Sequence, residues 1–402
     1  MPNFTPRRIL LIVGFLFLCT LLAVLLYVMF FKRRPAPVTP ATSGTPTSSS
    51  GLPTAGTGQP TVVPSTGQGA LPITQNDQTE NQLATRTLVS EPTRFSTTDA
   101  NGGGIVFYQS TTGIFSHADA SGNLQKLSDA KFPSIQNVTW APDRSQAVLE
   151  FPDGANVLYN FQTKKQVTLP QHWQDFSFSN NGSELAFKSM GLDVNNRWLG
   201  VANPDGSGAT AVEPLGNNAN NVMVTWSPSG QIVGLQHVPS GADQQDIFFV
   251  GLHGENFRSL TVPGIGFIPK WTPDGQQLLY SVTSARSDYR PELWVTNASG
   301  EQIGTGRRSL DIRTWANKCT FASTSELYCA VPESLPDGAG LTPAIAAATP
   351  DVIYKIDITT GQKTLVGLPD SSVTARSLSV SKDGSQLFVE DNQTGNIITV
   401  AL

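Results

Sequence analysis

Hydrophobic residues between positions 82 and 402 occur in short runs, many of which alternate with polar residues. These runs are rich in Val, Leu, Phe and Tyr, and clusters of Pro, Asp, Asn and Gly separate them. Alternation over a few residues is typical of short β-strands. The intervening clusters favour tight turns, because Pro presets φ and Gly accepts a positive φ. No amphipathic helix of any length is evident, so the pattern predicts an all-β domain.

The strands recur as a repeat, of which KWTPDGQQLLYSV is a clear copy. An aromatic residue or Val ends a first strand, a tight turn follows, and a second strand comes after it. Seven copies begin at Arg94, Thr139, Ser177, Thr225, Lys270, Thr314 and Ser379. A third strand follows every copy, and a fourth strand follows six of them. Four short antiparallel strands in about 40–50 residues are typical of a β-propeller blade.

These copies predict a seven-bladed β-propeller over residues 82–402. A six- or eight-bladed ring stays an alternative, because the copies at Arg94 and Thr314 are degenerate. The chain ends at Leu402 in a third strand, whereas QLATRTLVS at 82–90 has strand character and precedes the first copy. We therefore expect residues 82–90 to supply the missing fourth strand, which would close the ring and cover its free edge.

The copies resemble the WD40-like repeats of the TolB-type propeller family, whose pattern is W-[ST]-P-D-G-x-x-[IL]-x-[YF]. WSPSGQIVGL at 226–235 and WTPDGQQLLY at 271–280 carry the resemblance most clearly. It implies a scaffold that binds proteins or small ligands, and it transfers no activity, because one fold serves many functions.

The N-terminal region has a different composition. Residues 1–8 form a short tail, and residues 9–31 are apolar and uncharged. About 20 such residues suffice to cross a bilayer, and the apolar region of a cleaved signal peptide is shorter. Lys32-Arg33-Arg34 follows directly. We therefore predict an uncleaved, single-pass transmembrane anchor at 9–31.

Residues 32–81 are predicted to be a disordered linker. Pro, Thr, Ser and Gly dominate residues 35–76, which carry no charge, and such a segment buries too little apolar surface to order itself. Basic residues flank the anchor on both sides, so counting them does not set its orientation. The composition of the linker indicates an extracytoplasmic spacer, which places the propeller outside the cell membrane.

Cysteine usage agrees with that location. Cys319 and Cys329 lie ten residues apart in a hairpin-like stretch and could form a disulfide in an oxidising compartment. The alternative is a pair of reduced thiols in the core.

The net charge of the chain disfavours nucleic acid as a partner. The chain carries a net charge of −5, although five basic and no acidic side chains lie within its first 34 residues. The propeller is therefore more acidic than the whole chain, and nucleic acid would be repelled. We expect no nucleic-acid partner.

Common catalytic motifs are missing from the sequence. It contains no G-x-S-x-G, H-E-x-x-H, C-x-x-C or P-loop pattern, so we predict no catalytic residues, no cofactor and no metal. Asp143, Asp274 and Asp383 recur at the same turn of different repeats. A catalytic site usually needs one asymmetric cluster, so these aspartates are predicted to be structural.

Four tryptophans, at positions 140, 226, 271 and 315, are predicted to share one register of the repeat. An exposed aromatic row could bind sugars. The favoured interpretation is that the rings pack between blades, where large side chains fill the space between twisted sheets.

The architecture of the resembled family implies that two sets of loops lie on opposite faces of the ring. The turns from first to second and from third to fourth strands are short. The loops from second to third strands are long and irregular, at 189–197, 238–246, 283–291 and 332–350, and blade connectors at 170–175 and 263–269 join them. Function concentrates in such variable loops. The candidate partner-binding residues on this face are His172, Trp173, Arg197, His237, Phe267, Arg286, Asp288, Tyr289 and Arg290.

The sequence thus predicts a membrane-anchored extracytoplasmic propeller that acts without catalysis as a protein- or peptide-binding scaffold in the cell envelope. The alternative is a hydrolase or lyase that acts on envelope polysaccharide or peptide at the central funnel. A convergent cluster of acidic or His side chains with shifted pKa values at the funnel mouth would favour the enzyme. A third alternative is a spacer without a ligand.

Overall fold

The computed structural model describes residues 18, 20–22, 82–369 and 372–402. Residues 18 and 20–22 are helical. The predicted anchor and linker otherwise lie outside the described residues. No helix in the described part of the chain has the length and hydrophobicity of a membrane span.

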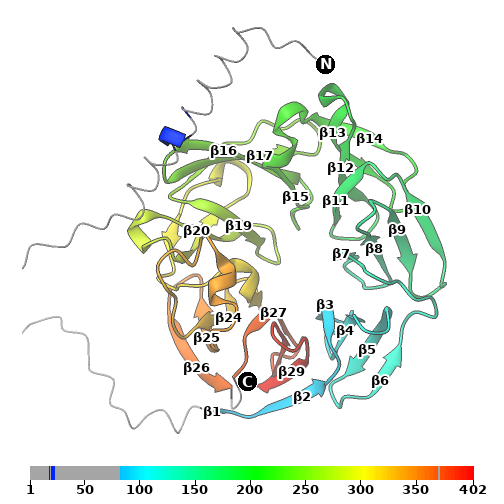
Figure 1. Cartoon of the computed structure of the whole chain (residues 1–402), viewed down its shortest axis with the longest axis vertical. Helices are drawn as coiled ribbons and strands as arrows, with labels where there is room; N and C mark the ends of the chain where they lie inside the picture. The colour runs from blue at the N-terminus through cyan, green and yellow to red at the C-terminus, as the bar shows by residue number, and fades with distance from the viewer. Residues whose placement is uncertain (1–17, 19, 23–81, 370–371) are drawn as a thin grey trace, which may run out of the picture. The chain divides into compact units, whose positions relative to one another are not determined.

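The described residues between 82 and 402 form seven sheets, antiparallel except for one added strand, which are arranged as the blades of a ring. The prediction of seven blades is therefore confirmed (Figure 1). Strand order follows chain order in blades 1 to 5, with the first strand innermost. In the first three blades the strands are β3 (Thr93–Thr98), β4 (Gly104–Gln109), β5 (Ile114–Asp119) and β6 (Leu124–Lys126); β7 (Asn137–Trp140), β8 (Gln146–Glu150), β9 (Asn156–Asn160) and β10 (Gln166–Leu169); and β11 (Trp173–Phe178), β12 (Leu185–Met190), β13 (Arg197–Ala202) and β14 (Thr210–Pro214).

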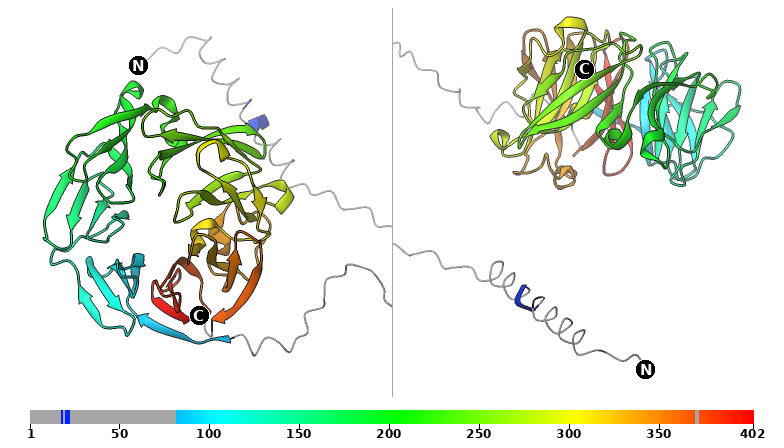
Figure 2. Two further views of the ribbon diagram at one scale, coloured as in Figure 1. Left: turned by 180° about the vertical axis from the view of Figure 1, so that it is seen from behind. Right: turned by 90° about the horizontal axis from the view of Figure 1, so that it is seen from above.

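The remaining blades follow the same plan, and the views from behind and above show their sheets standing around a common axis (Figure 2). Their strands are β15 (Val222–Val224), β16 (Ile232–Gly241), β17 (Gln244–Gly251) and β18 (Leu260–Val262); β19 (Ile265–Trp271), β20 (Gln277–Thr283), β21 (Pro291–Asn297) and β22 (Arg308–Ser309); β23 (Cys319–Phe321), β24 (Glu326–Pro332), β25 (Asp351–Asp357) and β26 (Lys363–Pro369); and β27 (Ala375–Val380), β28 (Gln386–Asp391) and β29 (Ile397–Ala401).

The start of the described propeller closes the ring. Strand β2 (Thr85–Val89) pairs antiparallel with β29, which makes it the fourth strand of blade 7. The prediction for residues 82–90 is therefore confirmed. Strand β1 (Gln82–Leu83) adds a feature that the sequence did not indicate, because it pairs in parallel with β26 at the outer edge of blade 6. The N-terminal segment thus joins the last two blades (Figure 1).

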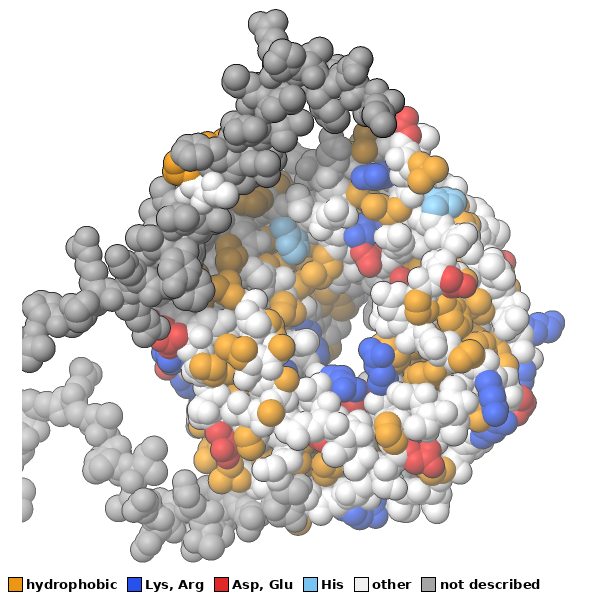
Figure 3. Space-filling view, in the orientation of Figure 1, with side chains coloured by type: hydrophobic (Ala, Val, Ile, Leu, Met, Phe, Trp, Pro, Cys, Tyr) orange, Lys and Arg blue, Asp and Glu red, His pale blue; other side chains and the backbone are white. Residues whose placement is uncertain are grey.

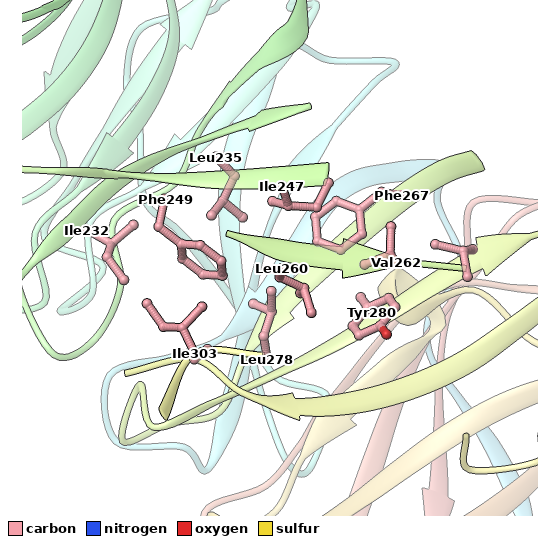
Figure 4. Packing of buried hydrophobic residues seen from close by; sticks show 12 residues of the cluster. Ile232, Leu235, Ile247, Phe249, Leu260, Val262, Phe267, Leu278, Tyr280 and Ile303 are labelled. Carbon is pink, nitrogen blue, oxygen red and sulfur yellow. The ribbon is translucent and has the colours of Figure 1, made fainter. Parts of the chain in front are cut away.

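The hydrophobic core lies between neighbouring blades. In one cluster, Leu235, Ile247 and Phe249 of blade 4 pack with Phe267 and Leu278 of blade 5 (Figure 4). Full burial of such a side chain contributes about 1.5–3 kcal/mol. Each blade therefore depends on its two neighbours for the burial of its faces.

A buried ion pair of blade 6 lies at the joint with blade 7. Lys318 Nζ lies 2.7 Å from both carboxylate oxygens of Asp351. The amide of Ala375 on β27 donates to Asp351 Oδ2 at 2.6 Å. Burial raises the pKa of Asp351, and the ammonium of Lys318 opposes that shift. Removing one partner from a buried pair typically costs about 3–5 kcal/mol. The pair holds the Asp351 carboxylate in place, and the Ala375 hydrogen bond to that carboxylate links blade 6 to blade 7.

Three of the four tryptophans make the predicted contacts between blades. Trp226 of blade 4 is buried in a cluster with Leu199 and Val201 of blade 3. Trp140 Nε1 donates to Phe95 O of blade 1 at 2.9 Å. Trp271 Nε1 donates to Thr225 Oγ1 of blade 4 at 3.0 Å. These indole rings therefore link each blade to the preceding one.

Trp315 does not share their register, so the sequence prediction was wrong for this residue. Trp271 pairs with Leu278 across the first two strands of blade 5, and the corresponding pair in blade 6 is Phe321 with Leu327. The short helix η5 (Ala316–Lys318) precedes β23, and Trp315 lies at its start. The first strand of blade 6 therefore begins at Cys319, because residues 314–318 are an insertion before the strand.

The repeated aspartates are structural, as predicted. Asp274 Oδ1 accepts hydrogen bonds from Thr272 Oγ1 at 2.6 Å and from the Gln276 amide at 3.1 Å. Asp143 and Asp383 accept the equivalent amide hydrogen bonds in their own turns. Each carboxylate therefore stabilises a turn between the first and second strands.

Cys319 and Cys329 face each other across β23 and β24. Their sulfur atoms are joined at 2.09 Å. Both residues are fully buried in the core between blades 5 and 6.

We expect removal of residues 1–90 to destabilise the propeller strongly, whereas removal of residues 1–81 should leave it folded. The longer truncation deletes the buried Leu88 and Val89, which together contribute at least about 3 kcal/mol, and it exposes the edge of β29. Chemical denaturation of the two truncated chains measures the difference. Equal stability would show that β2 does not close the ring.

Candidate functional site

The second-to-third strand loops and the blade connectors emerge at one face of the ring, which we call the long-loop face. Antiparallel pairing within each blade places these loops opposite the short aspartate turns. The predicted irregular loop at 238–246 is instead largely an extended hairpin, because β16 continues to Gly241 and β17 starts at Gln244. The insert at 332–350 contains the short helix η6 (Pro343–Ala346).

Three loops of this face form a continuous wall over blades 4, 5 and 6, here called the loop wall: residues 238–246, 283–291 and 332–350. The Ala285 amide donates to Asp243 Oδ2 at 3.0 Å, which joins the first two loops. The amides of Gly338 and Gly340 donate to the carbonyls of Asp288 and Tyr289, each at 2.8 Å. Hydrogen bonds therefore link all three loops.

Arg290 fastens the insert to blade 5 through its side chain. Its Nε donates to Leu335 O at 2.8 Å, and its guanidinium pairs with Asp288 at 3.1 Å and with Asp337. Both carboxylates are largely exposed, so each ion pair contributes only about 0–1 kcal/mol. Arg290 thus mainly orients the loops relative to one another.

The far end of the insert is attached to blade 7. Thr374 Oγ1 donates to Thr349 O at 3.2 Å, and Asn392 Nδ2 donates to Ala347 O, also at 3.2 Å. The insert is therefore held at both ends.

Two successive residues of the loop wall adopt left-handed backbone conformations. Asp288 and Tyr289 have φ values of 53° and 54°, and such a conformation costs roughly 1–2 kcal/mol for a residue other than glycine. It directs both carbonyls to the insert, where Gly338 and Gly340 donate to them. Hydrogen bonding across the loop wall offsets this strain.

Exposed aliphatic side chains lie on the long-loop face, mostly at loop tips. Leu192 is fully exposed, Leu341 and Ile345 are 52% and 51% exposed, and Val238 is 37% exposed. They belong to blades 3, 6, 6 and 4, respectively. The other exposed large hydrophobic residues of the described propeller lie near the outer edges of blades or at the C-terminus: Leu124, Val167, Phe248, Leu365 and Leu402.

The residues predicted for the binding face fall into three groups of exposure. His172, Arg286 and Asp288 are exposed, and Arg197, His237, Tyr289 and Arg290 are partly buried. Trp173 and Phe267 are only 5% and 4% exposed. The expectation of exposed rings at these two positions was wrong. Trp173 stacks on Phe187 with ring centroids 3.5 Å apart, and Phe267 packs between blades 4 and 5.

The loop wall brings Arg286, Asp288, Tyr289 and Arg290 together, while His172 and Arg197 lie on blade 3 and its connector. Sequence analysis missed the aliphatic tips at Leu192, Leu341 and Ile345, and it missed Asp243 and Asp337. The only available signal was an aliphatic residue inside a polar loop, such as Leu192 in SMGLDV. The contacts of the two aspartates depend on loops that are distant in the sequence.

Three basic side chains on first or second strands of their blades already have partners within the protein. Lys188 Nζ pairs with Asp175 and donates to Val222 O at 3.1 Å. Arg376 Nη1 donates to Glu390 Oε1 at 3.0 Å, and Lys270 Nζ donates to Cys319 O at 2.5 Å. Burial lowers the pKa of Lys270 to about 8. Basic and acidic side chains also gather around the central opening in the space-filling view (Figure 3).

No group of three or more His, Cys, Asp and Glu side chains in the described part of the chain is arranged to hold a metal ion. Burial raises the pKa of Glu150 and lowers that of His237. These two residues line neighbouring pockets on the long-loop face. Two titratable groups with shifted pKa values thus lie in neighbouring pockets of this face.

No protein-family model matches the sequence, and a search of curated proteins found no relative. Solved structures with the same fold do match. An oligogalacturonate lyase in complex with manganese is 12% identical, with 79% of this chain and 93% of that chain covered and a TM-score of 0.56. A β-propeller domain from Myceliophteria thermophila is 13% identical, with 79% and 99% covered and a TM-score of 0.54. A chain of a mitotic checkpoint complex is 12% identical, with 84% and 96% covered and a TM-score of 0.53. At these identities the similarity shows the propeller fold alone.

We expect Gly340→Ala to loosen the insert from blade 5. A Cβ atom at this position would lie 2.7 Å from Thr283 Cβ and 2.8 Å from Tyr289 O, and such overpacking typically costs about 1–3 kcal/mol. Limited proteolysis should show faster cleavage within 332–350. Gly103→Ala is the matched control, because a Cβ there meets no atom within 4 Å. Unchanged cleavage of the Gly340 variant would contradict a close attachment of the insert.

Proposed function

We propose that this chain is a membrane-anchored, extracytoplasmic β-propeller that binds a protein or peptide partner of the cell envelope through its long-loop face. It acts by binding and not by catalysis. The observation that carries this proposal is the presence of exposed aliphatic side chains beside the hydrogen-bonded loop wall.

Exposure of large aliphatic side chains favours a partner that covers them. Leu192, Leu341 and Ile345 contribute little to folding, because more than half of each side chain stays in water. Association with an apolar surface would remove them from water. Each Å² of apolar area buried in this way contributes about 25 cal/mol to the free energy of binding. Their position on variable loops of a rigid frame supports a role in recognition.

The loop wall supports binding in a second way. Its three loops are held to one another by the Asp243–Ala285, Asp288–Gly338 and Arg290–Leu335 hydrogen bonds. A surface that is already ordered loses less conformational entropy when a partner binds. Arg286 and Tyr289 lie on the same wall, and Arg and Tyr are enriched among residues that dominate protein interfaces.

The proposed location rests on the N-terminal sequence and the cysteines. The uncharged segment at 9–31 has the length of a membrane span. The Pro-, Ser- and Thr-rich linker supports a spacer outside the cytoplasm, and the joined Cys319 and Cys329 suit an oxidising compartment.

Replacement of aliphatic tips should weaken partner capture. In native membranes of the source cells, we expect Leu192→Ser with Leu341→Ser to reduce the yield of crosslinked partner at least tenfold, since tenfold in affinity corresponds to about 1.4 kcal/mol. Mass spectrometry identifies and quantifies the crosslinked proteins. Leu124→Ser with Leu365→Ser is the control pair, because these leucines are also exposed but lie on outer strands. Equal loss in both pairs, or no loss in either, would contradict a binding role for the aliphatic tips.

The topology has a separate test. Protease added to intact cells should cut the linker at 32–81 and release the propeller with Cys319 and Cys329 still bonded, as seen by mass under non-reducing conditions. Cleavage of the linker only after the cytoplasmic side is opened would contradict the extracytoplasmic location.

A further inference from the structure

A second region of the long-loop face has a different chemistry from the loop wall. Two neighbouring pockets, of about 400 and 350 Å³, lie over blades 2, 3 and 4. They share Asn137 and Asp175, so they form one continuous depression, which we call the amide groove.

Carboxamide side chains dominate the polar lining of the amide groove. The exposed ones are Gln136, Asn137, Gln171, Gln174, Asn220 and Asn221. A carboxamide offers two N–H donors and an oxygen acceptor and carries no charge. A sugar hydroxyl likewise donates and accepts, so the two groups can pair in either direction. Phe151, Pro152 and Phe176 add apolar surface that suits the C–H faces of a sugar ring.

Hydrogen bonds hold the floor of the amide groove in place. Asn137 Nδ2 donates to Glu150 Oε2 at 2.6 Å, and the Asp175 amide donates to Glu150 Oε1 at 3.3 Å. Asp175 pairs in turn with Lys188, whose ammonium also donates to the carbonyls of Val222 and Ala219 at 3.1 and 3.3 Å. Polar groups from blades 2, 3 and 4 are therefore fixed before any ligand arrives, which lowers the entropy cost of binding.

The charge of the amide groove disfavours an anionic ligand. Glu150 and Asp175 bring two carboxyl groups, whereas Lys188 is the basic side chain among the lining residues. All three N–H groups of Lys188 already have acceptors within the protein. An anion would therefore meet carboxylates without gaining a free cation.

The imidazole of His237 adds an uncharged polar group to the wall of the larger pocket. It packs edge to face on Phe267 with ring centroids 5.5 Å apart, and its buried Nε2 has no hydrogen-bond partner among the described residues. Burial lowers the pKa of His237, so the ring is neutral near pH 7.

We propose that the amide groove is a binding site for an uncharged oligosaccharide. A peptide ligand would use an exposed strand edge or deep apolar anchor pockets, whereas the accessible polar positions here are mostly carboxamides. This site is independent of the loop wall, because none of its lining residues except His237 lies close to the wall in sequence. If the amide groove binds no oligosaccharide, the proposed binding of a protein partner by the loop wall is unaffected.

The test uses the full chain, purified in a detergent without a sugar headgroup and applied to an array of neutral and acidic oligosaccharides. We expect retention of neutral members and none of tetragalacturonate. A neutral tetrasaccharide that the array retains is then titrated into the chain by isothermal titration calorimetry. Its dissociation constant should be at least tenfold higher for the Gln174→Ala, Asn221→Ala double variant than for the unaltered chain. Both residues are exposed, so the variant should fold normally.

The control is Gln125→Ala with Gln166→Ala, which removes two exposed carboxamides from the outer strands β6 and β10. It should bind the tetrasaccharide like the unaltered chain. Failure of the chain to bind any neutral oligosaccharide on the array would overturn the proposal. So would stronger binding of tetragalacturonate or of an extended octapeptide, or equal affinity of the two double variants.

Discussion

Closure of the ring is the constraint on which the rest of this structure depends. Every blade buries its faces against two neighbours, so an unclosed ring would leave two blade faces in water. The chain meets this requirement by pairing β2, from its N-terminal side, with β29 at its end. The short strand β1 and the hydrogen bond from the Ala375 amide to the buried Asp351 carboxylate reinforce the adjacent joint between blades 6 and 7.

A closed frame allows the two faces of the ring to differ. On one face, Asp143, Asp274 and Asp383 stabilise short turns of nearly constant geometry. On the other, three long loops of blades 4, 5 and 6 contact one another. The left-handed conformation of Asp288 and Tyr289 is tolerated there because their carbonyls bind the insert of blade 6.

The long-loop face holds two regions of contrasting chemistry. The loop wall and the aliphatic tips extend over blades 3 to 6, and the amide groove lies over blades 2 to 4. The first suits an apolar protein surface, and the second suits an uncharged hydroxyl-rich ligand. A scaffold of the proposed kind would use two such regions to hold a protein beside an uncharged oligosaccharide.

Local sequence determined the strands, the turns and the blade count, because alternation and turn chemistry act over a few residues. It also indicated that residues 82–90 would close the ring. It failed where the position or burial of a side chain depends on neighbours that are distant in the chain. Trp315 resembles the repeat tryptophans in sequence, yet it lies before β23, and Phe321 occupies the equivalent position of blade 6. Trp173 and Phe267 were expected on the surface, but adjoining strands bury them. The amide groove draws on residues from Gln136 to His237, and only closure of the ring brings side chains so far apart in sequence to one place.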